Sequence, residues 1–164
     1  MSILEICQWL QGTPISVSIR ESLLMFPLIE GTHLLALGLS TGTIVVSDLR
    51  MMGLVLKMES ASDVLHQILP WAIAGYAVMI VTGVLLFLSE PVKCYGNTSF
   101  RYKLLFLLLA GINVLVFHST RVYRQMKEWE HAESPPRAAK LAGVISLISW
   151  GVVIIAGRST AYHF

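Results

Sequence analysis

Four long apolar runs decide what this chain can fold into. They cover residues 21–47, 67–89, 104–120 and 139–157. At about 1.5 Å per residue, a helix over each run is long enough to cross a hydrocarbon core of about 30 Å. Only 13% of the residues are charged and 55% are hydrophobic, whereas about a quarter of a soluble domain is charged. The sequence therefore predicts an all-α integral membrane protein, with residues 1–164 forming a single transmembrane domain.

The connections between the runs are short, so consecutive helices should pack antiparallel as a four-helix bundle. Ahead of the first run, residues 3–11 place apolar side chains at helical spacing among polar ones, until Gly12 and Pro14 end the pattern. This segment is typical of a short interfacial helix. The first nineteen residues hold no Lys or Arg ahead of an apolar core. We therefore expect them to remain in the mature chain instead of acting as a secretory signal.

The basic residues predict an orientation. Seven lie on the face that carries the loops after the first and third helices, and five lie on the opposite face. The seven are Arg50, Lys57, Arg121, Arg124, Lys127, Arg137 and Lys140. The positive-inside rule makes this face cytoplasmic and puts both termini in the periplasm, across a bacterial inner membrane. Because these charges lie between membrane helices, they give no reason to expect a nucleic acid as partner.

Glu30 and His33 lie inside the first apolar run, where ionisable side chains are costly and usually functional. With each helix midpoint taken as the membrane centre, Trp150 lies near the depth of His33, and Asn113 lies just inward. The sequence thus predicts a polar site at the middle of the bundle. The alternative reading is that these groups only form hydrogen bonds between helices.

Haem b is the cofactor that this pattern favours, because imidazole is its usual axial ligand. We expect His33 to be one ligand and His118 the second, although the same depth count separates them by about 10 Å. His66 and His131 are expected to be solvated. Lys103 opens the third membrane helix and Arg158 closes the fourth, so both could receive the haem propionates, or serve only as interfacial anchors.

Several segments resemble a group of small four-helix bacterial membrane proteins catalogued as a family of unknown function. The segments are HLLALG at 33–38, SDLRMMG at 47–53, TGVLLF at 82–87, FRYK at 100–103 and the stretch 150–162. More distantly, His33, Lys103 and Asn113 are similar to a pattern in CopD-like copper-resistance domains and HemJ-type protoporphyrinogen oxidases. That resemblance implies that His33 is a haem or metal ligand and that Lys103 is its companion. The spacing from Lys103 to His118 departs from the HemJ pattern, so the oxidase activity is not implied.

Three functions stay open at this point, and the residues do not decide whether the chain is an enzyme. In the first, a b-type haem protein passes electrons between a quinone or membrane enzyme and a partner on the periplasmic side. In the second, His33, Met79 and Glu30 handle copper in the CopD manner. In the third, the chain is a cofactor-free subunit of a larger complex or of a homo-oligomer.

Overall fold

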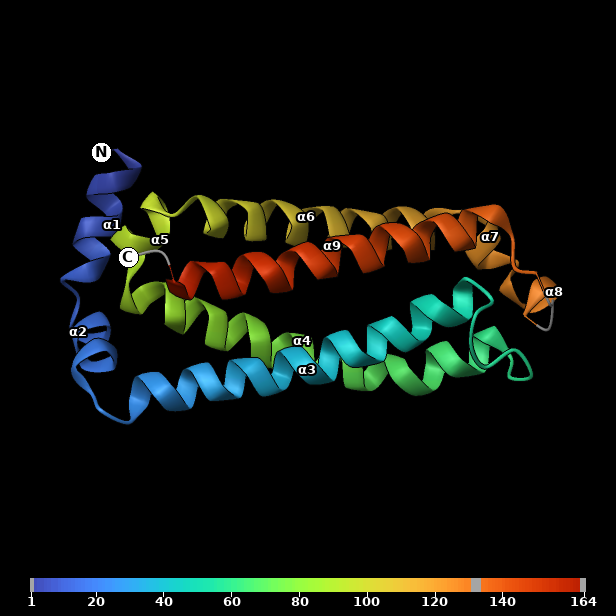
Figure 1. The fold of residues 1–164 in the computed structure, drawn as a ribbon, viewed down its shortest axis with the longest axis horizontal. Helices are drawn as coiled ribbons and strands as arrows, with labels where there is room; N and C mark the ends of the chain where they lie inside the picture. Colours follow the sequence, from blue (N-terminus) through green and yellow to red (C-terminus); the bar gives the residue numbers. More distant parts are fainter. Residues whose placement is uncertain (1, 131–133, 163–164) are drawn as a thin grey trace.

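The computed structural model describes residues 2–130 and 134–162, and its side chains as far as Thr160. His131 and His163 thus lie outside the described residues. The described part is all-α, as predicted (Figure 1). In chain order its helices are α1 (Ile3–Gln11), α2 (Pro14–Glu21), α3 (Met25–Met51), α4 (Ala61–Ser89), α5 (Pro91–Gly96), α6 (Thr98–Ser119), α7 (Arg121–Arg124), α8 (Met126–Trp129) and α9 (Arg137–Tyr162).

Helices α3, α4, α6 and α9 are long and apolar enough to cross a membrane, which confirms a multi-pass membrane protein with four candidate spans. The first and last residues of these helices differ from the limits of the apolar runs. Helix α6 begins at Thr98 instead of 104, because the Asn97 side chain accepts a hydrogen bond from the backbone N–H of Phe100 at 3.2 Å. Helix α3 continues to Met51 instead of ending at 47. Capping residues thus set the helix ends, while apolarity marks only the part inside the hydrocarbon.

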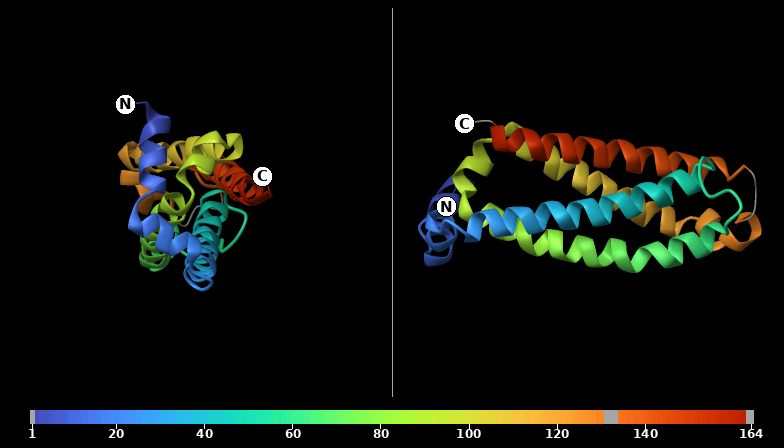
Figure 2. Two further views of the ribbon diagram at one scale, coloured as in Figure 1. Left: turned by 90° about the vertical axis from the view of Figure 1, so that its left-hand side faces the viewer. Right: turned by 60° about the horizontal axis from the view of Figure 1, so that its bottom comes forward.

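The four long helices pack as two hairpins, α3 with α4 and α6 with α9, and the hairpins meet where α3 packs on α9 (Figures 1 and 2). Glycines allow these close approaches. A Cβ on Gly75 of α4 would lie 3.0 Å from the Ala36 carbonyl oxygen of α3, and one on Gly143 of α9 would lie 2.9 Å from the Asp48 carbonyl oxygen. No comparable packing joins α4 to α6. They touch near α5, where the rings of Phe87 and Phe100 stack with centroids 5.9 Å apart, and stand apart toward the other end of the bundle.

The short helices α1, α2 and α5 lie at one end of the bundle, which we call the cap end (Figure 1). Gly12 ends α1 as predicted, but the chain then starts a further helix, α2, with Thr13 as its N-cap and Pro14 in its first turn. Ser16 and Arg20 of α2 each donate a hydrogen bond to the backbone carbonyl of Ser89, at 3.4 and 3.3 Å. Helices α1 and α2 therefore hold the end of α4, and α1 also packs on α5.

Arg50 organises the opposite end, which we call the loop end. The sequence predicts that Arg50 is a loop residue, but in the structure it belongs to α3 and only 1% of it is exposed. Its guanidinium donates to the backbone carbonyl of Glu59 at 2.7 and 3.0 Å and to that of Glu130 at 2.6 Å. Because one guanidinium carries five N–H donors, Arg50 can join the α3–α4 loop to the end of α8.

Candidate functional site

The structure brings His33, Lys103 and the Thr82 hydroxyl together near the cap end. His33 of α3 is 8% exposed and its ring lies against α4. Gly83 makes room for it, since a Cβ there would lie 3.3 Å from His33 Cε1. Lys103 reaches in from α6, and its stem lies along Gly157 of α9. All four long helices therefore contribute to this group, which we call the His33 layer.

Hydrogen bonding fixes which ring nitrogen of His33 is free. Its Nδ1 lies 2.8 Å from the Thr82 hydroxyl oxygen. That hydroxyl already donates its single hydrogen to the Val78 carbonyl at 2.7 Å, so it accepts from His33. The Met79 backbone carbonyl is a further acceptor for His33. Nδ1 therefore carries the proton, and in the neutral ring Nε2 keeps its lone pair, which is the form that binds a metal.

Lys103 is half-buried within the bundle, and its charge acts on His33. Arg158, the other cation predicted for the propionates, has an exposed side chain next to Gly157. Glu30 lies one helical turn from His33 on the cap-end side and is half-buried. It forms no hydrogen bond or ion pair with another described residue. Of the predicted residues, Lys103 is thus the one that the structure places beside His33.

His118 lies far from the His33 layer. Asn113 of α6 donates to the Ala142 carbonyl of α9 at 2.9 Å, and the neighbouring Gly143 touches Asp48 of α3. Asn113 and Asp48 therefore share one level of the bundle. Counting from that level at about 1.5 Å per residue, His33 lies on the cap-end side and His118 on the loop-end side, about 30 Å apart along the bundle axis. One iron cannot bind both side chains in this arrangement.

The sequence predicts a His33–His118 separation of only about 10 Å because the midpoint of each apolar run was taken as the membrane centre. Helix α3 extends further toward the loop end, and α6 starts nearer the cap end, than their apolar runs suggest. His118 itself is exposed at the end of α6. Its Nδ1 donates to the Val114 carbonyl at 2.8 Å, and its ring centroid lies 4.1 Å from that of Tyr123.

Trp150 and Asn113 lie between these two histidines. Trp150 is 5% exposed and packs with Ala36 and Met79 in the middle of the bundle. Its ring meets that of Tyr76 edge to face, with centroids 6.4 Å apart. Both Trp150 and Asn113 therefore have structural contacts, and both also line a cleft.

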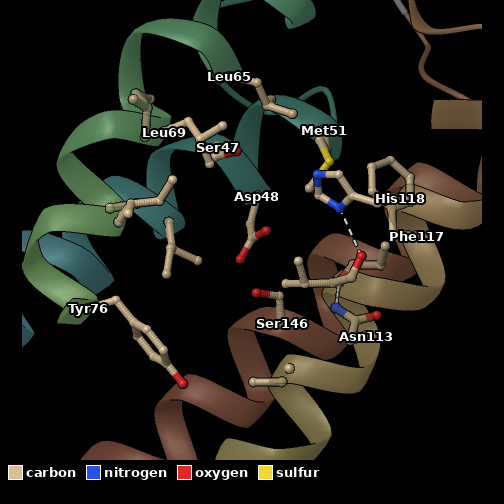
Figure 3. A pocket seen from close by; sticks show the side chains of 18 of the residues that line it. Ser47, Asp48, Met51, Leu65, Leu69, Tyr76, Asn113, Phe117, His118 and Ser146 are labelled. Atoms are coloured by element: carbon tan, nitrogen blue, oxygen red, sulfur yellow. Dashed lines mark hydrogen bonds between the residues drawn. The ribbon is translucent and has the colours of Figure 1, made fainter. Parts of the chain in front are cut away.

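This cleft lies where α4 and α6 stand apart, and it has a volume of about 590 Å³. Its walls are largely apolar side chains of α4 and α6, and residues of α3 and α9 form its floor (Figure 3). The most notable floor residue is Asp48, which is 3% exposed. The Ser146 hydroxyl faces its carboxyl group, and no described residue forms a hydrogen bond with its Oδ2 atom.

Sequence reasoning missed Asp48. It ended the first membrane helix at residue 47, which placed this acid in the following loop. One signal could have found it: Asp48 directly continues the apolar run and Arg50 follows two residues later, so one more turn of helix would carry an acid into the bundle. Only the packing of α3 on α9 shows that the carboxyl group is buried.

The described residues contain no group of three or more His, Cys, Asp or Glu side chains that could hold a metal ion. Both cysteines lie near the cap end, Cys7 buried and Cys94 half-buried. Burial raises the pKa of the Cys94 thiol above its ordinary value, and Glu90 raises it further, while Lys103 and Lys93 act in the opposite direction. The net increase makes Cys94 a poor thiolate ligand at neutral pH.

The hydrogen bonds of His33 predict its tautomer. We expect solid-state NMR on ¹⁵N-histidine protein in lipid, at neutral pH, to show a His33 ring protonated at Nδ1 and unprotonated at Nε2, because Thr82 can only accept. The His33→Ala variant assigns the signal by its loss. A His33 ring protonated at Nε2 and bare at Nδ1 would contradict the bonding scheme.

Comparison with known proteins places this arrangement in a family. No curated protein and no solved structure matches the chain. A protein family described as a family of unknown function, DUF6644, matches residues 25–163, which include all four long helices, the His33 layer and the cleft. The chain therefore belongs to the DUF6644 family.

Proposed function

We propose that this protein binds one b-type haem through His33 and passes electrons within the membrane. The observation that carries the proposal is the buried His33 ring, whose Nδ1 is held by Thr82 so that Nε2 is free to bind iron. Lys103 beside it could pair with a propionate. The similarity of His33, Lys103 and Asn113 to the pattern in CopD-like and HemJ-type domains also supports this choice.

The proposal assigns one protein ligand to the iron. His118 is left out because about 30 Å along the bundle axis separates it from His33. The redox chemistry would belong to the haem, while His33 would ligate and orient it and Lys103 would set the local charge. Copper handling would use the same His33, but the described residues contain no group of three or more His, Cys, Asp or Glu side chains that could hold the ion with it.

The orientation that we propose puts the cap end in the periplasm of a bacterial inner membrane. It rests on the seven basic residues of the loop-end face, against five elsewhere. Electrons would then pass between a quinone or membrane enzyme and a partner near the cap end. A reporter enzyme fused after Phe164 should be active on the periplasmic side, and strong activity in the cytoplasm would reverse this orientation.

Absorption spectroscopy tests the haem. Protein purified after haem-replete expression should show a Soret band and a positive pyridine haemochrome assay. In His33→Ala the band should disappear or move to a high-spin position, because an axial ligand is lost. Lys103→Ala should keep the band but change the reduction potential, since only a neighbouring charge is removed.

His118→Ala is the matched control, because it removes an exposed histidine far from the site and should leave the spectrum unchanged. Colourless wild-type protein would reject haem binding and favour a cofactor-free subunit. Coloured protein whose spectrum responds to His118→Ala but not to His33→Ala would reject the site.

A further inference from the structure

The cleft between α4 and α6 opens toward the lipid. Several apolar residues of its walls are also exposed on the outer surface of the bundle: Leu69 is 47% exposed, Ile73 58% and Leu115 72%. Its volume of about 590 Å³ lies within the range of about 300 to 1,000 Å³ that small-molecule sites occupy. An apolar molecule dissolved in the bilayer can therefore reach the cleft from the side without passing through water.

A single acidic group lies on the floor of this apolar space. Only 3% of Asp48 is exposed, and its carboxyl group faces into the cleft (Figure 3). Its Oδ2 atom accepts no hydrogen bond from the described residues. In the ionised carboxylate this oxygen is an acceptor, and a buried acceptor that stays unpaired costs free energy.

The other polar groups of the cleft do not supply the missing donor. The Asn113 amide nitrogen is bonded to the Ala142 carbonyl, and His118 Nδ1 is bonded to the Val114 carbonyl. Ser146 faces Asp48, yet Oδ2 still lacks a partner. The cleft residues, all of which lie in the described part of the chain, include no Lys or Arg. The vacant acceptor thus calls for a donor from outside the protein.

We propose that this cleft binds a lipid-soluble molecule with an apolar body and one hydrogen-bond-donating head group, a hydroxyl or an ammonium, which donates to the Asp48 carboxyl group. The apolar walls bury the body, and the donor satisfies Oδ2. The site is separate from the His33 layer, since the two lie about 22 Å apart along α3. It therefore does not rest on the haem proposal.

Three probes of equal chain length test the head group: 1-dodecanol, dodecylamine and dodecyl methyl ether, which has no donor. Binding to the full chain in detergent is measured by native mass spectrometry. At least one donor probe should bind wild-type protein about tenfold or more tightly than the ether, as expected for a hydrogen bond to a carboxyl group. This preference should vanish in Asp48→Ala and persist in Asp63→Asn, a matched loss of an exposed acid outside the cleft.

The Asp48→Asn variant separates the two kinds of head group. Its amide oxygen still accepts a hydrogen bond but carries no charge. A preference for the alcohol should therefore survive this change, whereas a preference for the amine should fall. Equal binding of the ether and both donor probes to wild-type protein would overturn the proposal.

A second variant tests the location even if Asp48→Ala fails to fold. Gly111 lines the cleft and no heavy atom lies within 4 Å of the position of an added Cβ, so Gly111→Phe should fill the cleft and weaken all three probes by tenfold or more. Gly42→Phe is the matched control, because Gly42 is equally open but lies outside the cleft. Wild-type affinity in Gly111→Phe would place the probes elsewhere and reject the site.

Discussion

The contact between α3 and α9 is the interaction on which the rest of this structure depends. Gly143 of α9 lies so close to the Asp48 carbonyl of α3 that a Cβ there would be 2.9 Å from the oxygen. Lipid tails are as apolar as the helix surfaces, so membrane helices associate mainly through close packing, which small residues allow. This contact joins the two hairpins along α3 and α9 and leaves α4 apart from α6 toward the loop end. The cleft and its acidic floor are consequences of that arrangement.

The bundle therefore contains two groups of polar side chains at different depths, the His33 layer and the pair of Asp48 and Ser146. Near the cap end, His33 and Lys103 come together where all four long helices contribute, and Thr82 orients the imidazole. Toward the loop end, Asp48 and Ser146 lie at the base of a space that opens to the bilayer. We propose a haem iron for the first group and a lipid-soluble hydrogen-bond donor for the second. Because they lie at different depths, both sites could be occupied together.

Much of the fold could be predicted from sequence because the thickness of the hydrocarbon core sets the length of an apolar run. All four candidate spans follow from that one constraint, and the structure confirms them. The helix α1 follows from the helical spacing of its apolar residues, and the structure confirms a helix there. Apolarity does not report where a helix ends. Asn97 extends α6 beyond its run by capping it, and α3 continues through Asp48 and Arg50. Because the predicted helix ends lacked these extra turns, the predicted central site combined His33 with Asn113, which the structure places at different depths.

The sequence also could not predict which neighbours a polar side chain contacts. Arg50 looks like a loop charge, but the backbone carbonyls that it binds belong to residues 59 and 130, and only the folded chain brings these together. Asp48 likewise becomes a candidate binding residue only because α9 covers it in the folded chain. His33, in contrast, could be found from sequence, because an ionisable residue within a long apolar run is unusual wherever its helix ends.

The most direct test of this account is the stability of Gly143→Val against that of Gly151→Val, measured by reversible SDS unfolding in detergent micelles. Both glycines lie in α9, but a Cβ at Gly151 would meet no heavy atom within 4 Å. We predict that Gly143→Val lowers the free energy of unfolding by about 1–3 kcal/mol, as overpacking does. Gly151→Val should stay within about 0.5 kcal/mol of the wild type. Equal stability of the two variants would contradict the α3–α9 contact as the basis of the bundle.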